Sequence, residues 1–119
     1  MDHIVYLNRK AKELENLKSG AKTMIIRGAM GRKLPYGILN VGEVLYFAEN
    51  SGDGLVKAKA VVSEVFNSEK LSREESIELV NARQNELKLD KAMFNRFAGK
   101  RYIVLIKIKE FKTIENFKF

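Results

Sequence analysis

The sequence predicts a single α+β domain in which five or six mostly antiparallel strands form a small β-barrel with helices packed around it. Its 119 residues are enough for one hydrophobic core and too few for two. Strand-like segments outnumber helix-like ones, and several are joined by short links that favour antiparallel hairpins. A doubly wound parallel sheet is excluded, because strands and long helices do not alternate along the chain.

The first third of the chain predicts a strand, a helix and a second strand. Residues 4–7 and 23–26 are short and rich in β-favouring side chains. Asn8 is placed to cap a helix over residues 9–19, and Gly20 is placed to end it. The apolar positions of this helix recur every three residues, at Ala11, Leu14 and Leu17. The helix is therefore expected to turn one apolar face to the core.

Residues 28–42 predict the longest irregular segment of the chain. Residues that break regular structure are dense here: Gly28, Gly31, Pro35, Gly37, Asn40 and Gly42. A long loop retained in a small domain usually carries function. This loop also contains two cations close to a tyrosine: Arg32, Lys33 and Tyr36.

Two strand-like runs, residues 44–47 and 55–66, flank the turn-forming residues 50–54 and predict a hairpin. In the second run, apolar side chains alternate with lysines. One face consists of Val56, Ala58, Ala60 and Val62. This alternation predicts one buried face, and the small side chains of Ala58 and Ala60 predict close packing against a neighbour such as a helix.

The last third predicts two helices and two closing strands. Ser72 and Glu75 form a capping box for a helix over residues 73–87. A shorter helix is expected over residues 91–97 and is followed by Gly99. The closing strands are expected at residues 102–109, buried on both faces at the start, and at residues 111–119, as an edge strand.

Composition excludes several classes of site. The chain has no cysteine and one histidine, which removes disulfides, thiolate zinc sites, thiol nucleophiles and histidine-rich metal sites. We therefore expect no metal and no cofactor, and we expect a structural or incidental role for His3. No apolar run approaches the ~20 residues of a membrane helix, and no secretory signal is visible. A cytoplasmic location without a membrane partner is expected.

Charge is the first indication of a partner. Twenty-two lysines and arginines against 15 acidic residues give a net charge of +7, and the sequence pI is about 9.7. This balance makes polyanions such as RNA plausible partners, although lysine-rich composition also serves solubility alone. No glycine-rich phosphate loop of the nucleotide-hydrolase type is present, which argues against ATP chemistry.

Two cations stand at the ends of the second predicted strand, Lys22 before it and Arg27 at its far end. Five extended steps would separate their α-carbons by roughly 16 Å, which suits two phosphates, or a phosphate and a base. They could equally be ordinary charges at strand ends. In either case we expect both side chains to be partly solvated. Of the aromatic residues, Tyr36 is the best candidate for stacking on a base, and core positions are expected for Tyr46, Phe47, Phe66, Phe94, Phe97 and Tyr102.

Residues 20–27 resemble the signature of the ASCH family of PUA-like β-barrels, which has the form GxKxxExR after a helix. Gly20, Lys22 and Arg27 stand at the matching places. Residues 40–47, 56–66 and 99–108 resemble later strands of that family, so the similarity covers about two-thirds of the chain. It implies a single PUA-like domain over residues 1–119 that binds RNA or a modified nucleotide. The residues expected to bind are Lys22, Thr23, Arg27, Arg32, Lys33 and Tyr36.

The same resemblance implies an alternative, a small amidohydrolase that acts on an acylated nucleoside such as 4-acetylcytidine. Lys22 matches the lysine of those enzymes and would be catalytic. Ile25 stands where they have a threonine and where the wider family has an acid, and Thr23 lies two residues earlier on the same strand face. The glutamate that would complete such a site is one of five, and the sequence does not choose among them: Glu64, Glu69, Glu74, Glu75 and Glu86. A protein-interaction domain is the third possibility.

Overall fold

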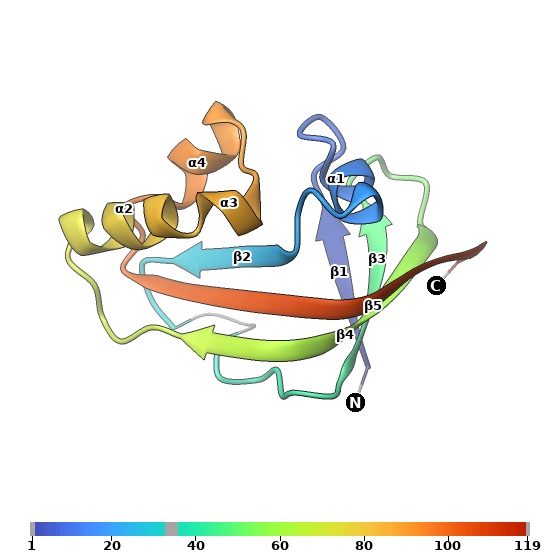
Figure 1. Ribbon diagram of the computed structural model, residues 1–119, viewed down its shortest axis with the longest axis horizontal. Coiled ribbons are helices and arrows are strands. Elements are labelled where there is room, and N and C mark those ends of the chain that lie inside the picture. The colour runs from blue at the N-terminus through green and yellow to red at the C-terminus, as the bar shows by residue number, and fades with distance from the viewer. Residues whose placement is uncertain (1, 33–35, 119) are drawn as a thin grey trace.

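The computed structural model describes residues 2–32 and 36–118. The strands are β1 (Asp2–Leu7), β2 (Met24–Ala29), β3 (Val44–Glu49), β4 (Leu55–Asn67) and β5 (Tyr102–Lys118). The helices are α1 (Glu13–Ser19), α2 (Arg73–Ala82), α3 (Gln84–Leu87) and α4 (Lys91–Phe97). Figure 1 shows α2, α3 and α4 beside β2 and β5, and α1 at the other end of the molecule, near β1 and β3.

The five strands form one curled sheet in the order β1-β3-β4-β5-β2. β1 pairs with β3 in parallel, and every other neighbouring pair is antiparallel. The two sheet edges, β1 and β2, approach each other without pairing, so the sheet is a half-barrel with an open seam. The predicted α+β fold, a small and mostly antiparallel PUA-like barrel with flanking helices, is confirmed in this form.

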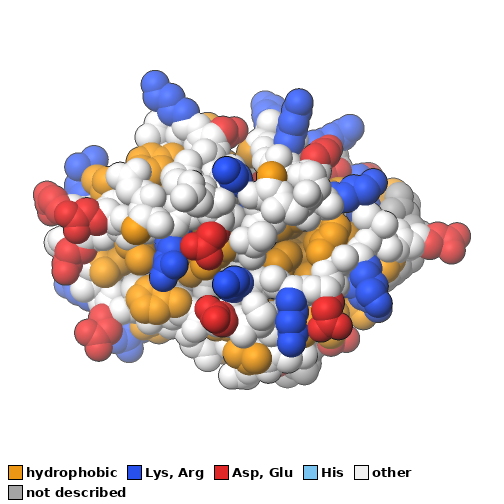
Figure 2. Space-filling model, viewed as in Figure 1, with side chains coloured by type: hydrophobic (Ala, Val, Ile, Leu, Met, Phe, Trp, Pro, Cys, Tyr) orange, Lys and Arg blue, Asp and Glu red, His pale blue; other side chains and the backbone are white. Residues whose placement is uncertain are grey.

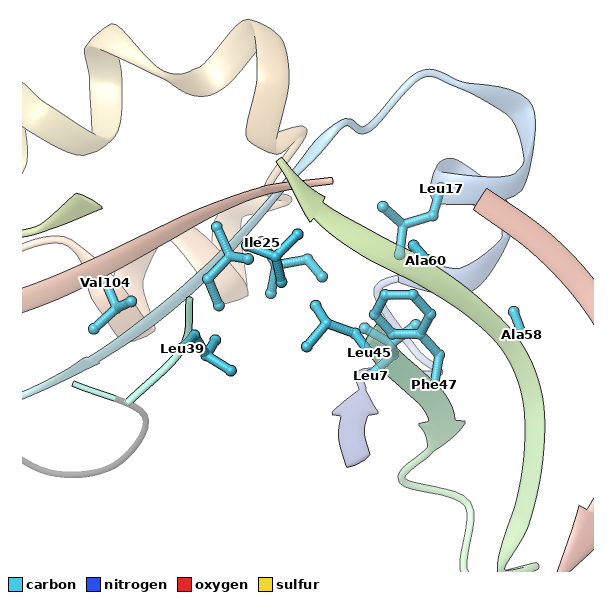
Figure 3. Packing of buried hydrophobic residues seen from close by; sticks show 11 residues of the cluster. Leu7, Leu17, Ile25, Leu39, Leu45, Phe47, Ala58, Ala60 and Val104 are labelled. Carbon is cyan, nitrogen blue, oxygen red and sulfur yellow. The ribbon is translucent and has the colours of Figure 1, made fainter. Parts of the chain in front are cut away.

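Two apolar clusters hold the helices on the sheet. One fills the inside of the curl, where the predicted alternating face of β4 is buried and Leu17 of α1 packs with it. Figure 3 shows Leu17 beside Ala60, with Phe47 and Leu45 nearby, so the expected close approach of a helix to the alanines is confirmed. The other cluster lies under α2, α3 and α4. β2 separates the two clusters, with Ile25 in one and Ile26 in the other.

Local geometry corrects three expectations. The predicted helix over residues 73–87 is divided at Arg83 into α2 and α3, although its capping box is present as expected. The first helix begins at Glu13 rather than residue 9, because Lys12 has a positive φ of 56°. β5 is one continuous strand to Lys118, paired with β2 and β4, so the expected separate edge strand is wrong.

The expected aromatic core is correct only in part. Phe47 and Phe97 are buried, whereas Phe66 lies near the end of β4 with 49% of its surface exposed. A register shift between Val62 and Glu64 exchanges the two faces of β4, so Val65 packs against the core cluster and Phe66 faces solvent. Alternation along a strand identifies its two faces, but it does not reveal a bulge that exchanges them.

Candidate functional site

The seam between β1 and β2 opens into a cleft of about 430 Å³. Its walls come from β1, β2, α1 and α4, which are far apart in the sequence, and from the residues that follow β1 and β3. Its apolar lining is Ile4, Val5, Ile25, Leu39, Met93, Phe97 and Ile106. Its polar lining is His3, Tyr6, Asn8, Glu13, Arg27, Asn50 and Arg96. We call this hollow the seam cleft.

Arg27 spans the seam. Its Nη2 donates to the carbonyl oxygen of Tyr6 at 2.7 Å, and its Nη1 donates to that of Ile26 at 2.7 Å. The guanidinium therefore links the unpaired edge of β2 to the unpaired edge of β1. Burial lowers the pKa of Arg27, the nearby charge of Glu13 raises it, and that of Arg96 lowers it further. An arginine stays protonated in proteins despite such shifts, so the cleft retains a fixed positive charge here.

Lys22 lies beneath the cleft and not in its lining. Its side chain is only 2% exposed, so the expectation that Lys22 would be partly solvated is wrong. Its Nζ donates to the carbonyl oxygen of Leu87 and lies 3.5 Å from Oε2 of Glu13. Glu13 is 3% exposed, and its Oε1 accepts from the backbone N–H of Asn8 at 2.7 Å. The buried ion pair therefore ties α1 to the start of β2 and to the end of α3.

Burial also shifts the proton affinity of this lysine. Desolvation lowers the pKa of Lys22 below its ordinary value, although the charge of Glu13 and its hydrogen bond partly oppose the shift. A buried ammonium requires such a counter-ion, because an unpaired charge in a low-dielectric interior is costly. Glu13 lines the cleft while Lys22 does not, so the carboxylate is the part of the pair that the cleft reaches.

Arg96 supplies a second positive charge from the opposite wall. It is exposed on α4, and its guanidinium carbon lies 5.3 Å from the centroid of the Phe97 ring. Asp90 fixes the start of α4 by accepting from the backbone N–H of Met93 at 2.8 Å. Among the described residues, no carboxylate forms an ion pair with Arg96, so its charge faces the seam cleft and solvent.

Further polar groups at the seam are held by the backbone around them. Oδ1 of Asn8 accepts from the N–H of Ala11, and Oδ1 of Asn50 accepts from the N–H of Arg9. Nε2 of His3 lies 3.1 Å from Oε1 of Glu43, so this histidine has a structural contact as well as a place in the lining. Because Oδ1 of Asn50 is held by the backbone of Arg9, the orientation of the whole Asn50 amide, including its NH2 group, is fixed.

The structure brings only some of the sequence-predicted residues together. Arg27 lines the seam cleft, and Thr23 is exposed with its backbone N–H bonded to the carbonyl of Glu86. Arg32 lies over the rings of Tyr36 and Tyr102, at 5.6 and 5.5 Å from their centroids. The Tyr36 hydroxyl donates to the carbonyl of Ser68 at 2.6 Å, which places this ring outside the cleft lining. Lys33 lies outside the described residues.

Glu13 and Arg96 are the site residues that the sequence did not identify. None of the five glutamates left open forms an ion pair with Lys22, and two of them, Glu64 and Glu86, line a different hollow of about 510 Å³. A signal for Glu13 was nevertheless present. It precedes Leu17 by four residues and so shares the buried face of the helix, where a carboxylate requires a cation.

The described residues contain neither a metal-binding cluster nor a membrane-spanning helix. No group of three or more histidine, cysteine, aspartate or glutamate side chains is placed to hold a metal ion within residues 2–32 and 36–118. In the same part of the chain, no helix has both the length and the apolar character needed to cross a membrane.

No family model and no curated protein matches the chain. Solved structures do resemble it. The crystal structure of ASCH from Zymomonas mobilis is 11% identical, with a TM-score of 0.70, and the match covers 98% of this chain and 72% of that one. The crystal structure of the hypothetical protein PH0355 is 15% identical, with a TM-score of 0.62, and the match covers 96% of this chain and all (100%) of that one. The chain therefore has an ASCH-like fold, as the resemblance of residues 20–27 implied.

Proposed function

We propose that this protein binds a nucleotide, either free or within single-stranded RNA, in the seam cleft. The observation that carries the proposal is the pair of positive charges at this cleft, Arg27 on β2 and Arg96 on α4, beside an apolar lining. The net charge of +7 favours the approach of a polyanion.

The size and chemistry of the cleft fit such a ligand. Its volume of about 430 Å³ lies within the range of small-molecule sites, which are typically apolar with a few placed polar groups. The guanidinium of Arg96 can donate two parallel hydrogen bonds to a phosphate. Tyr6, which is 54% exposed, contributes an aromatic side chain to the same lining, and aromatic side chains commonly stack on bases.

In this account the two sequence-predicted cations have different tasks. Arg27 contributes charge while it holds the two walls of the cleft together. Lys22 does not reach the ligand and instead neutralises Glu13 beneath the lining. Arg96 is the cation that is free to contact phosphate directly.

A titration with nucleoside monophosphates and short RNAs at low ionic strength tests the proposal. Replacing Arg96 by glutamine removes a charge-assisted contact worth about 1.5–3 kcal/mol, so affinity should fall by roughly 10- to 150-fold. Lys18→Gln is the matched control, since it removes an exposed lysine that does not line the cleft. The proposal fails if the unmodified protein binds none of these ligands, or if Arg96→Gln and Lys18→Gln bind equally well.

An amidohydrolase acting on an acylated nucleoside is the second candidate. It is favoured by the position of Glu13, a carboxylate that lines the cleft and lies 3.5 Å from a lysine with a lowered pKa. Such a pair suits proton transfer during amide hydrolysis. Two features count against it: Lys22 is shielded from the cleft, and Ile25 lines the cleft where a hydroxyl would be needed.

Incubation with 4-acetylcytidine separates the two candidates. Deacetylation that is abolished by Glu13→Gln and by Lys22→Met would make the protein an enzyme. We expect the protein to bind cytidine monophosphate and to leave 4-acetylcytidine unhydrolysed.

A further inference from the structure

A second hollow, of about 580 Å³, lies where the end of β2 meets the start of α2 and the start of β5. Its charged lining consists of cations alone: Lys70 and Arg73 at the entrance to α2, and Arg101 just before β5. Met30 and Gly99 also line it. We call this hollow the basic groove, and no described acidic residue is part of its lining.

The backbone of the basic groove is firmly connected. The N–H of Leu71 donates to the carbonyl of Arg101 at 2.8 Å, which joins its two charged segments directly. Beside them, the N–H of Gly99 donates to Oγ of Ser76 at 3.0 Å. A methyl group added to Gly99 would lie 3.6 Å from Cγ of Arg73, so the stem of this arginine rests over the glycine. The cations therefore extend from a fixed frame.

The charges of the basic groove are not neutralised within the described chain. All three cationic residues are exposed, and none of them forms an ion pair with a described carboxylate. Glu69 adjoins Lys70 in the sequence and Glu74 adjoins Arg73, but neither glutamate lines the groove. A concave surface with three unpaired cations attracts phosphates, and each phosphate bound there releases condensed counterions.

Two elements lead from the seam cleft to the basic groove. On β2, Arg27 lines the cleft, and Met30, just beyond the strand, lines the groove. Three steps along the chain separate them, a distance of at most about 10 Å. On α4, Phe97 lines the cleft, and Gly99, just beyond the helix, lines the groove. A strand of nucleic acid leaving the cleft along either element would therefore reach the groove.

We infer that the basic groove binds backbone phosphates of a single-stranded nucleic acid, of which one nucleotide occupies the seam cleft. This inference rests on the proposed function and extends it from a single nucleotide to a polynucleotide. The arginines can hold phosphate oxygens in forked pairs, and Lys70 can act as a point charge. The groove would add affinity that grows with ligand length and falls with salt.

The test compares Arg73→Gln/Arg101→Gln with Lys18→Gln/Lys109→Gln, which removes two exposed cations that line neither hollow. The probes are cytidine monophosphate and single-stranded RNA and DNA of about a dozen nucleotides. Affinity is measured over a range of salt concentrations, and the midpoint of thermal unfolding verifies that each variant is folded. Lys70→Gln serves as a second groove variant should the arginine pair not fold.

For the longer strands, the groove variant should have a log–log salt slope shallower by about 1.4, since each phosphate contact contributes about 0.7. When the salt concentration rises fourfold, the affinity of the control should therefore fall about seven times further than the affinity of the groove variant. Monophosphate binding should be unchanged. RNA and DNA should lose the same slope if only phosphates are read, and a loss confined to RNA would add the ribose to the recognised groups.

Three results would overturn the inference, and they also distinguish it from the proposed function. If the unmodified protein binds the monophosphate and gains nothing from a longer strand, the groove inference fails and the cleft proposal stands. If the longer strand binds through the groove while Arg96→Gln has no effect on any probe, the shared path fails together with the cleft proposal. Equal salt slopes for the groove variant and the control would contradict the inference outright.

Discussion

At the scale of single residues, the buried pair of Lys22 and Glu13 is the most constrained feature of the molecule. Both side chains are almost fully buried, and both are held by backbone groups as well as by each other. The sequence identified Lys22 as a candidate site residue but did not indicate its burial, because a lysine just after the glycine that ends a helix is usually a solvated charge. The partner comes from an earlier helix, and only tertiary packing brings the two together.

Removing one member of this pair should destabilise the protein strongly. Lys22→Met leaves Glu13 buried without a counter-ion, which should cost about 3–5 kcal/mol in the free energy of unfolding. Adding Glu13→Gln removes the stranded charge and should restore much of that loss. Chemical denaturation of both variants measures this coupling. Equal stability of the single and the double variant would show that the pair is not coupled.

The pH dependence of stability should also report on Lys22. Because burial lowers its pKa in the folded state, the unfolded chain holds this proton over an interval in which the folded chain has released it. Unfolding free energy should therefore rise with pH from the lowered pKa up to about 10.4 and should lose this contribution as pH falls through the lowered pKa. Denaturation curves over this interval, with Lys22→Met/Glu13→Gln as reference, measure it. Identical pH slopes in the two proteins would contradict the assignment.

At the scale of elements, most strands and helices were predictable, and the exceptions have local causes. The alternation in β4 and the capping box of α2 are local signals, and both are present as expected. The break after α2 had no such signal. There the N–H of Arg83 donates to the carbonyl of Val80, three residues back, instead of continuing the α-helical pattern, and sequence periodicity does not reveal this change.

The seam between β1 and β2 depends on side chains from separate elements, so its geometry could not be read from either strand alone. Arg27 was expected to be a partly solvated ligand-binding residue. In the structure, its hydrogen bond to the carbonyl of Tyr6 joins the two edges. Arg27 therefore lines the seam cleft and also joins β2 to β1.

Arg27→Ala should therefore destabilise the protein. Losing a charge-assisted hydrogen bond to a backbone carbonyl costs about 1.5–3 kcal/mol in unfolding free energy. Most surface substitutions change the unfolding free energy by no more than about 0.5 kcal/mol. Arg27→Lys should recover part of the loss, since an ammonium can still donate to one carbonyl. Thermal unfolding of both variants tests this expectation, and an unchanged midpoint for Arg27→Ala would show that the edges need no such link.

At the scale of the whole molecule, the curled sheet opens at the seam between β1 and β2, where Arg27 and Arg96 line the seam cleft. Figure 2 shows Lys and Arg side chains projecting from the upper edge of the view, over α4 and α1, and acidic side chains interspersed on the same face. The net charge was evident from composition. The grouping of Arg27 with Arg96 at the seam cleft, and of Arg73 with Arg101 at the basic groove, depends on the fold and was not evident from composition.

Nucleic-acid binding should consequently be sensitive to salt in proportion to the phosphates bound. A single nucleotide carries no condensed counterion atmosphere and should give a shallow slope, whereas single strands should give a slope of about −0.7 for each phosphate contact. Fluorescence anisotropy at several ionic strengths measures these slopes. A slope near zero for long RNA would mean that charge has no part in recognition.

The central claim is that a nucleotide occupies the seam between β1 and β2, and amide chemical shifts test it most directly. Cytidine monophosphate is titrated into isotopically labelled protein at low ionic strength while the backbone amide signals are followed. Our account predicts that saturable shifts cluster at residues 3–6, 25–27 and 93–97, and that Arg96→Gln reduces them. Shifts that are absent, or that fall only on surfaces remote from these three segments, would contradict it.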